Sequence, residues 1–175
     1  MYSLIPNLIY DSIIDLTPDV LNAHDIRVLL MDFDNTIVPY TSNEPEESFF
    51  SWLDAVKAAG IHLCVVSNTK KGRAIEFCRR QGIDCITHAK KPFQKGIGRA
   101  KEKYAGFGRI ALVGDQIFTD TWAGKRLGMK SYLLPPIRDK RDPFTRFKRL
   151  CEKPVLRRYY KEMKEKEEEK ARNDG

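Results

Sequence analysis

The chain has 175 residues, of which 42% are hydrophobic and 31% charged, and its formal net charge is +7. This size and composition suffice for one buried core with a modest extension at either end. No segment reaches the roughly 20 apolar residues of a spanning helix, and the N-terminus lacks a basic region and a cleavage site, so we expect neither a transmembrane segment nor a signal peptide.

The first 25 residues are predicted to form an amphipathic segment. Their apolar side chains recur at helical spacing. They are Leu4, Ile5, Leu8, Ile9 and Ile13. Thr17 and Pro18 then predict a short helix, because threonine caps helix starts and proline fits the first turn. Residues 1–25 either pack on the core or insert into a membrane surface.

Residues 26–136 alternate between apolar runs and helical stretches, which predicts an α/β domain. The expected strands lie at 26–33, 61–66, 84–87, 109–113 and 130–134. Helical stretches at 45–59, 70–81, 93–104 and 118–127 separate them. Short strands with helical crossovers predict a mostly parallel five-stranded sheet that is covered by helices on both faces, a three-layer sandwich.

Residues 137–175 carry the positive charge of the chain. Ten lysines and arginines against three acids lie between Arg138 and Lys161, and the remainder of the chain is neutral. Aromatic and aliphatic residues recur among these cations, Pro154 is expected to start a second helical piece, and the final KEKEEEK run is expected to fray in solvent. The segment predicts an anionic partner, either a lipid surface or a nucleic acid, although packing on the core would also explain its apolar stripe.

Polar residues follow four of the predicted strands, at the edge where parallel sheets bind ligands. Asp32 and Asp34 lie at the end of the first strand, Ser67 and Asn68 follow the second, Lys90 and Lys91 the third, and Asp115 the fourth, with Asp120 five residues later. Carboxylates, a hydroxyl and a lysine at one edge are the groups that metal-assisted phosphoryl transfer requires.

Each residue type has a chemical reason to be there. One of the paired carboxylates, Asp32 or Asp34, can attack phosphorus while the other donates a proton to the leaving group. Clustered carboxylates repel one another and the phosphate, which predicts Mg²⁺ as cofactor. Ser67, Asn68 and a lysine can bind the phosphate oxygens. Lys90 and Lys91 both remain candidates for this lysine, and Asp120 either supports the site or caps a helix.

The strings DFDNT, VVSN, KKP and GDQIFTD resemble the four motifs of the haloacid dehalogenase (HAD) superfamily. More narrowly they are similar to the YqeG-like phosphatases of HAD subfamily IIIA, which are related to the mitochondrial phosphatidylglycerophosphatases. The resemblance implies that Asp32 is the nucleophile and Asp34 the acid/base. It also implies that Ser67 and Lys91 bind phosphate and that Asp115 and Asp32 hold Mg²⁺. We expect Asp34 to be a third metal ligand beside Asp32 and Asp115.

No cap domain fits this sequence. Only 30 residues separate Thr36 from Ser67, and 22 separate Asn68 from Lys91, which is enough for one helix and one strand each. An uncapped site admits a bulky substrate, such as a lipid headgroup at a bilayer or a nucleic-acid end.

The expected function is hydrolysis of phosphatidylglycerophosphate to phosphatidylglycerol by a peripheral protein on the inner face of the cell membrane. The four cysteines show no CxxC spacing, which predicts reduced thiols in the cytoplasm. The alternatives are an uncapped phosphatase that acts on nucleic-acid ends or small metabolites, and a HAD scaffold that only binds. No nucleic-acid partner is expected, because the basic patch has no stacking aromatics near the catalytic loops.

Overall fold

The computed structural model describes residues 3–69, 72–138 and 143–173. The chain divides into two units, Met1–Asp139 and Lys140–Gly175. All strands of the described residues lie in the first unit.

Six parallel strands form one sheet in the order β1-β6-β5-β2-β3-β4. They are β1 (Leu8–Ile9), β2 (Ile26–Met31), β3 (His62–Val66), β4 (Asp84–Ile86), β5 (Arg109–Gly114) and β6 (Lys130–Leu133). The central strand is β2, whose Leu29 pairs with Leu63 of β3 and Ala111 of β5. Strands β3 and β4 lie on one side of β2, and β5 and β6 lie on the other. The connections therefore diverge at the carboxyl end of β2.

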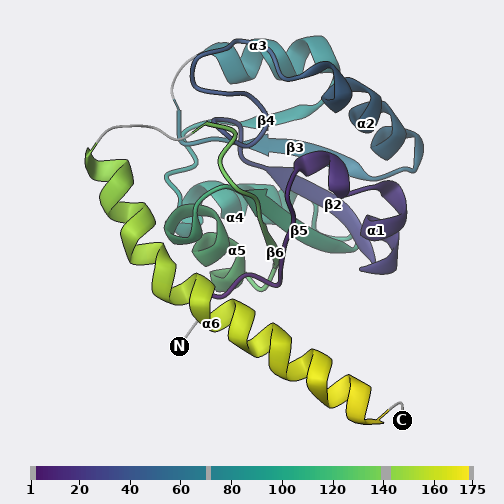
Figure 1. Cartoon of the computed structure of the whole chain (residues 1–175). Coiled ribbons are helices and arrows are strands. Elements are labelled where there is room, and N and C mark those ends of the chain that lie inside the picture. The colour runs from purple at the N-terminus through teal and green to yellow at the C-terminus, as the bar shows by residue number, and fades with distance from the viewer. Residues whose placement is uncertain (1–2, 70–71, 139–142, 174–175) are drawn as a thin grey trace. The chain divides into compact units, whose positions relative to one another are not determined.

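Helices cover both faces of the sheet, as expected for a three-layer α/β fold (Figure 1). One face packs against α1 (Pro18–Ala23), α2 (Glu47–Ala58) and α3 (Gly72–Gln81), and the other against α4 (Gln94–Lys103) and α5 (Trp122–Arg126). Alternate residues of β2 point to opposite faces of the sheet. Leu29 and Met31 pack in the core under α1, α2 and α3, and Val28 and Leu30 pack in the core under α4 and α5. The parallel, two-faced α/β prediction is therefore confirmed.

The described connections contain no cap domain. The chain between β2 and β3 holds one helix, α2, and the described residues between β3 and β4 hold α3 alone. The carboxyl edge of the sheet is thus left without an inserted lid, as the short spacing between motifs predicted.

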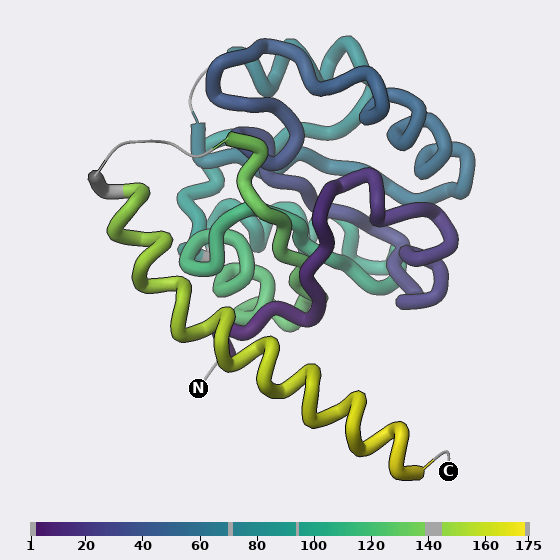
Figure 2. Tube along the Cα trace, in the orientation of Figure 1, coloured from purple at the N-terminus to yellow at the C-terminus, as the bar shows by residue number. Residues whose placement is uncertain are grey.

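The predicted count of five strands was wrong, because the N-terminal segment adds a sixth. Leu8 and Ile9 form the edge strand β1 and pair with Tyr132 and Leu133 of β6, so two segments far apart in sequence run side by side (Figure 2). A turn of 3₁₀-helix, η1 (Ile13–Asp15), follows it. Residues 3–12 form no helix despite the helical spacing of their apolar side chains, and Pro6 was the available signal, since proline opposes a helix interior.

Packing accounts for much of the N-terminal apolar stripe. Ile13 is buried in the core that α1, α2 and α3 cover, and Leu8 packs against the same core. The short helix α1 was predicted correctly: the Thr17 hydroxyl accepts a hydrogen bond from the Val20 N–H at 3.3 Å, and Pro18 opens the first turn.

The second unit contains one helix, α6 (Pro143–Asn173). The predicted break at Pro154 was wrong, because this proline lies inside a continuous helix, where it removes one hydrogen bond without ending the helix. The charged run is helical as far as Asn173, with Lys161–Glu165 and Lys164–Glu168 ion pairs one helical turn apart, and its expected fraying stays a prediction. Positions 139–142 and the side chain of Phe144, which the sequence assigned to the basic segment, lie outside the described residues.

Candidate active site

Two carboxylates stand at the ends of neighbouring strands. Asp32 directly follows β2, and its N–H donates to the Val113 carbonyl of β5 at 2.9 Å, so the backbone pairing extends to the nucleophile candidate. Asp115 directly follows Gly114, the last residue of β5. Adjacent parallel strands therefore deliver both side chains to one point at the carboxyl edge of the sheet.

A third carboxylate completes a buried cluster with these two. Carboxylate oxygens of Asp32, Asp115 and Asp120 all lie within 4.8 Å of one another, and all three residues are buried. The buried Lys91 forms ion pairs with Asp32 and, at 2.6 Å, with Asp120. With all four groups ionised, three negative charges face one positive charge, so two negative charges remain for a divalent cation to balance. Hard oxygen ligands of this kind fit Mg²⁺.

The pKa values of Asp32 and Lys91 are both raised in this buried cluster of charged groups. Burial, opposed by Lys91 and reinforced by Asp120 and Asp115, raises the pKa of Asp32 to about 8. Burial alone would lower the pKa of Lys91, but the carboxylates of Asp120 and Asp32 outweigh it and hold the pKa above its ordinary value. The lysine is therefore a fixed positive charge, and Asp32 needs further positive charge to ionise fully.

Asp120 belongs to the site and is more than a helix cap. It lies in the π-helical turn η2 (Ile117–Thr121) that precedes α5. Its Oδ2 accepts hydrogen bonds from the Gln116 N–H at 3.2 Å and the Thr119 hydroxyl at 3.0 Å. A Cβ at Gly114 would lie 2.3 Å from Asp120 Cγ, so this close approach requires glycine.

The third motif places Lys91, and not Lys90, at the cluster. Lys90 is exposed, whereas Lys91 is buried against Asp32 and Asp120. Asn68 fixes the backbone of Lys91 from both sides. The side-chain oxygen of Asn68 accepts a hydrogen bond from the Lys91 N–H at 2.6 Å, and its side-chain amide donates to the Lys91 backbone carbonyl at 3.1 Å. The Asn68 side chain is thus engaged in holding Lys91, and its predicted phosphate contact stays a prediction.

Ser67 directly follows β3 and is buried beside the segment that carries Lys91. Its carbonyl accepts from the Ala89 N–H at 3.0 Å, and its hydroxyl oxygen accepts from the Thr69 N–H at 3.1 Å. The hydroxyl proton of Ser67 can still be donated, as a phosphate-binding role would require.

The structure separates Asp34 from the carboxylate cluster. Asp34 lies in the turn after Asp32, and its carboxylate pairs with Arg73 in the first turn of α3. Arg73 was not among the residues predicted from the sequence. A cation in the first turn of a helix is disfavoured by the helix dipole, and that anomaly was the available signal for a nearby carboxylate. Among the described residues, the side chains close enough to share a cation are those of Asp32, Asp115 and Asp120, and the predicted role of Asp34 as a metal ligand stays a prediction.

Asn35 also contacts the candidate active site, although it was not among the residues predicted from the sequence. Its backbone is left-handed, with φ of 68°. Its side-chain oxygen accepts from the Arg138 N–H at 3.0 Å, its carbonyl accepts from the Ile137 N–H at 3.1 Å, and its amide lies 3.5 Å from Asp115. Asn35 therefore joins the turn after the nucleophile to Asp115 and to the segment that leaves β6.

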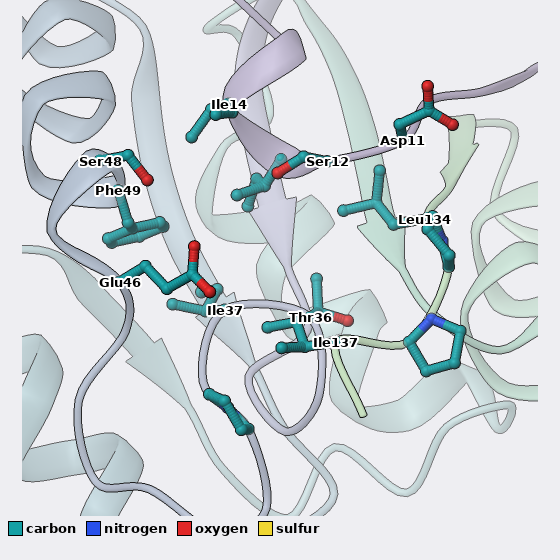
Figure 3. A pocket seen from close by; sticks show the side chains of 14 residues that line it. Asp11, Ser12, Ile14, Thr36, Ile37, Glu46, Ser48, Phe49, Leu134 and Ile137 are labelled. Atoms are coloured by element: carbon teal, nitrogen blue, oxygen red, sulfur yellow. The ribbon is translucent and has the colours of Figure 1, made fainter. Parts of the chain in front are cut away.

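A pocket of about 290 Å³ adjoins the other side of this turn. Figure 3 shows the side chains that surround it, from the turn after β2, the residues around η1, the start of α2 and the segment after β6. Its lining is mostly apolar, with the acids Asp11 and Glu46 at its wall. None of the clustered carboxylates lines it, so the pocket is separate from the candidate active site.

Comparisons with known proteins relate the chain to phosphatases. Residues 2–137 match the sequence profile of a family described as mitochondrial PGP phosphatase, a range that contains all three clustered carboxylates and Lys91. The probable phosphatase YqeG of Bacillus subtilis strain 168 is 29% identical over 153 residues, which is 87% of this chain and 89% of that protein.

Solved structures share the fold. An uncharacterized protein from Listeria monocytogenes serotype 4b has a TM-score of 0.52 at 16% identity, over 67% of this chain and 85% of that one. A hypothetical protein from Xanthomonas campestris has a TM-score of 0.51 at 16% identity, over 77% of this chain and 76% of that one. At such identities the likeness concerns the fold alone.

Proposed function

The chain belongs to the mitochondrial PGP phosphatase family and is a phosphatase, and from this premise we propose that it hydrolyses phosphatidylglycerophosphate to phosphatidylglycerol through a phosphorylated Asp32. One observation carries the proposal: Asp32, Asp115, Asp120 and Lys91 converge at the carboxyl end of the central strand, and Asp34 stands two residues from Asp32. This arrangement supplies a nucleophile, an acid and fixed charge around one point.

The chemistry proceeds in two displacements. An Asp32 oxygen forms a bond to phosphorus as the bond from phosphorus to the leaving-group oxygen breaks, and Asp34 gives its proton to that oxygen. Asp34, now ionised, takes a proton from water as the water oxygen attacks the phosphorus of phospho-Asp32. This step releases inorganic phosphate and restores both carboxyls.

Charge balance explains the other residues. Asp32, Asp115 and Asp120 would hold Mg²⁺, which supplies positive charge to the phosphoryl oxygens and to ionised Asp32 when it is bound. Lys91 neutralises one further negative charge at a fixed position, and the Ser67 hydroxyl donates to a phosphate oxygen. Asn68 acts through Lys91, whose backbone it holds.

A substrate panel tests the proposed reaction. We expect kcat/KM for phosphatidylglycerophosphate in mixed micelles to exceed the values for glucose 6-phosphate and a 3′-phosphorylated oligonucleotide by about 100-fold or more. An uncapped site depends on the remote part of its substrate for selectivity, since no lid contributes contacts. Phosphate release is measured at equal Mg²⁺ and detergent. A preference for the oligonucleotide or the sugar phosphate would replace the lipid with that substrate class.

We also propose that α6 brings the protein to the inner face of an anionic membrane. Exposed cations and apolar side chains alternate along α6 at spacings of three and four residues, which places them on one face of the helix. They are Arg146, Leu150, Lys153, Arg157 and Tyr160. No helix among the described residues is long and apolar enough to cross a bilayer, so this attachment would be peripheral.

Vesicle flotation tests this attachment. We expect the protein to float with vesicles that contain anionic phosphatidylglycerol and to remain below with neutral phosphatidylcholine vesicles. Exchanging Arg146, Lys153 and Arg157 for glutamine should weaken binding about 100-fold, because each cation near such a surface contributes about 1 kcal/mol. The matched control exchanges Lys164, Lys166 and Lys170, which lie among glutamates in the last turns of α6. Equal loss in both triple variants would contradict a localised binding face.

A further inference from the structure

Arg73 connects α3 to the turn and loop that follow the nucleophile. Its Nη2 pairs with the Asp34 carboxylate, and its Nη1 donates to the Ser42 carbonyl and, at 3.4 Å, to the Pro39 carbonyl. The guanidinium carbon also lies 5.2 Å from the centre of the buried Phe33 ring. One side chain thus contacts the candidate acid and both ends of the 39–42 segment.

We propose that Arg73 is a positioning residue for the acid step: it keeps the Asp34 carboxyl in one position, two residues from the nucleophile, by linking it to the 39–42 segment. The inference rests on the proposed function, because it needs Asp34 to be the proton donor. A planar guanidinium can donate to a carboxylate and to carbonyls at the same time in a fixed geometry, which a flexible ammonium cannot do. Holding a reacting group in place matters for the rate, since a displacement of about 1 Å can cost about 100-fold.

The Arg73–Asp34 ion pair is less exposed to solvent than a neighbouring ion pair of the same helix. Arg80 of the same helix pairs with Glu44 just beyond the segment, at 2.6 Å, and these side chains are 42% and 49% exposed. The Arg73 and Asp34 side chains are only 19% and 22% exposed. Partly shielded charges with several hydrogen bonds keep their geometry better than exposed pairs, most of which contribute little.

The location of Arg73 on its helix supports the same conclusion. It lies in the first turn of α3, where the exposed N–H groups disfavour a cation. An arginine in this position needs compensating acceptors, and the structure supplies one carboxylate and two carbonyls. These acceptors all belong to the chain between the nucleophile and α2.

The acid step offers a readout that a general folding defect would not reproduce. A leaving group that is a strong base needs the Asp34 proton as its bond to phosphorus breaks, whereas a weakly basic leaving group departs without it. Phenyl phosphate and p-nitrophenyl phosphate form a matched pair, because they differ in the basicity of the oxygen and little in shape. A misplaced Asp34 should therefore harm the first substrate more.

The experiment compares kcat/KM for both substrates in Arg73→Met, Arg73→Lys and wild-type protein. For Arg73→Met we expect a loss of about 10- to 100-fold with phenyl phosphate and a loss about tenfold smaller with p-nitrophenyl phosphate. The loss should fall on kcat more than on KM, because Lys91 and the carboxylate cluster are unchanged. Arg73→Lys keeps a charge beside Asp34 and should recover part of the activity with phenyl phosphate.

Arg80→Ala is the control, since it releases α3 from Glu44 without touching Asp34, and it should retain both activities within about threefold. Equal losses with both substrates in Arg73→Met would overturn the proposal, because they would indicate a purely structural role. A rise in KM alone would also overturn it, because it would indicate that Arg73 contacts the substrate. If Arg73→Met does not fold, the same substrate comparison applies to Arg73→Lys, and equal losses there reject the proposal. Wild-type protein that cleaves neither substrate would count against the proposed function itself.

Discussion

Replacing Asp32 by asparagine is expected to lower kcat for p-nitrophenyl phosphate by about four orders of magnitude or more. An amide is a poor nucleophile, and without the covalent step water must attack phosphorus directly. The substitution keeps the shape of the side chain, so the fold should survive. Phosphate release by wild type and variant at saturating Mg²⁺ gives the comparison, and similar rates would eliminate Asp32 as the nucleophile.

The same variant should be more stable than wild type when a chelator removes divalent cations. The folded pKa of Asp32 is about 8, above the ordinary value of 3.8, so the folded protein holds more protons than the unfolded chain between these values. The contribution of Asp32 to the free energy of unfolding of the wild type therefore falls as the pH rises from about 4 to 8. Because asparagine does not titrate, the Asp32→Asn variant does not lose this stability. We expect its free energy of unfolding at pH 7 to exceed that of wild type by about 2 kcal/mol.

Urea denaturation in chelator at pH 5 and pH 8 measures this difference, which should be larger at pH 8. Added Mg²⁺ should then reverse the order, because a ligand that binds only the folded state stabilises it in proportion to its affinity. Wild type should gain melting temperature with Mg²⁺ and the asparagine variant should gain much less. A pH-independent difference, or equal Mg²⁺ effects in both proteins, would show that Asp32 does not belong to a cation site.

The parts of the site that the sequence revealed are those fixed by strand ends. Asp32 and Asp115 follow apolar runs, and parallel pairing of those runs dictates that they meet. Lys91 was harder to assign, since Lys90 and Lys91 follow the same strand. Tertiary contacts decide between them: the Asn68 amide clamps the backbone of Lys91, and the buried carboxylates provide its partners.

The parts that the sequence did not reveal depend on contacts between distant segments. Arg73 and Asp34 are 39 residues apart, and no local pattern joins them. The edge strand β1 forms because β6, more than 120 residues later, offers unpaired backbone groups, which no periodicity in residues 4–13 encodes. Continuity of α6 through Pro154 likewise depends on the turns on either side outweighing one lost hydrogen bond.

The second large effect is expected from Lys91→Met, which removes the positive charge buried in the cluster. Because three carboxylates would then face one another with no cation from the protein, we expect a loss of about 3–5 kcal/mol in the free energy of unfolding in chelator. Loss of fixed charge at the transferred phosphoryl group should also lower kcat/KM about 100- to 1,000-fold in Mg²⁺. The exposed neighbour offers a matched control, since Lys90→Met should change both quantities little.

A double variant separates charge balance from simple packing. Lys91 pairs with Asp32 and Asp120, so above pH 8, where Asp32 of the wild type is ionised, the Asp32→Asn substitution removes one of its two charge partners. The destabilisation caused by Lys91→Met should therefore be smaller by about 1–3 kcal/mol in that background than in wild type. Denaturation of the four proteins of the cycle measures the coupling. If the two substitutions were strictly additive, the Lys91 charge would not be coupled to Asp32, and the positive charge that the catalytic proposal places beside the nucleophile would have to come from elsewhere.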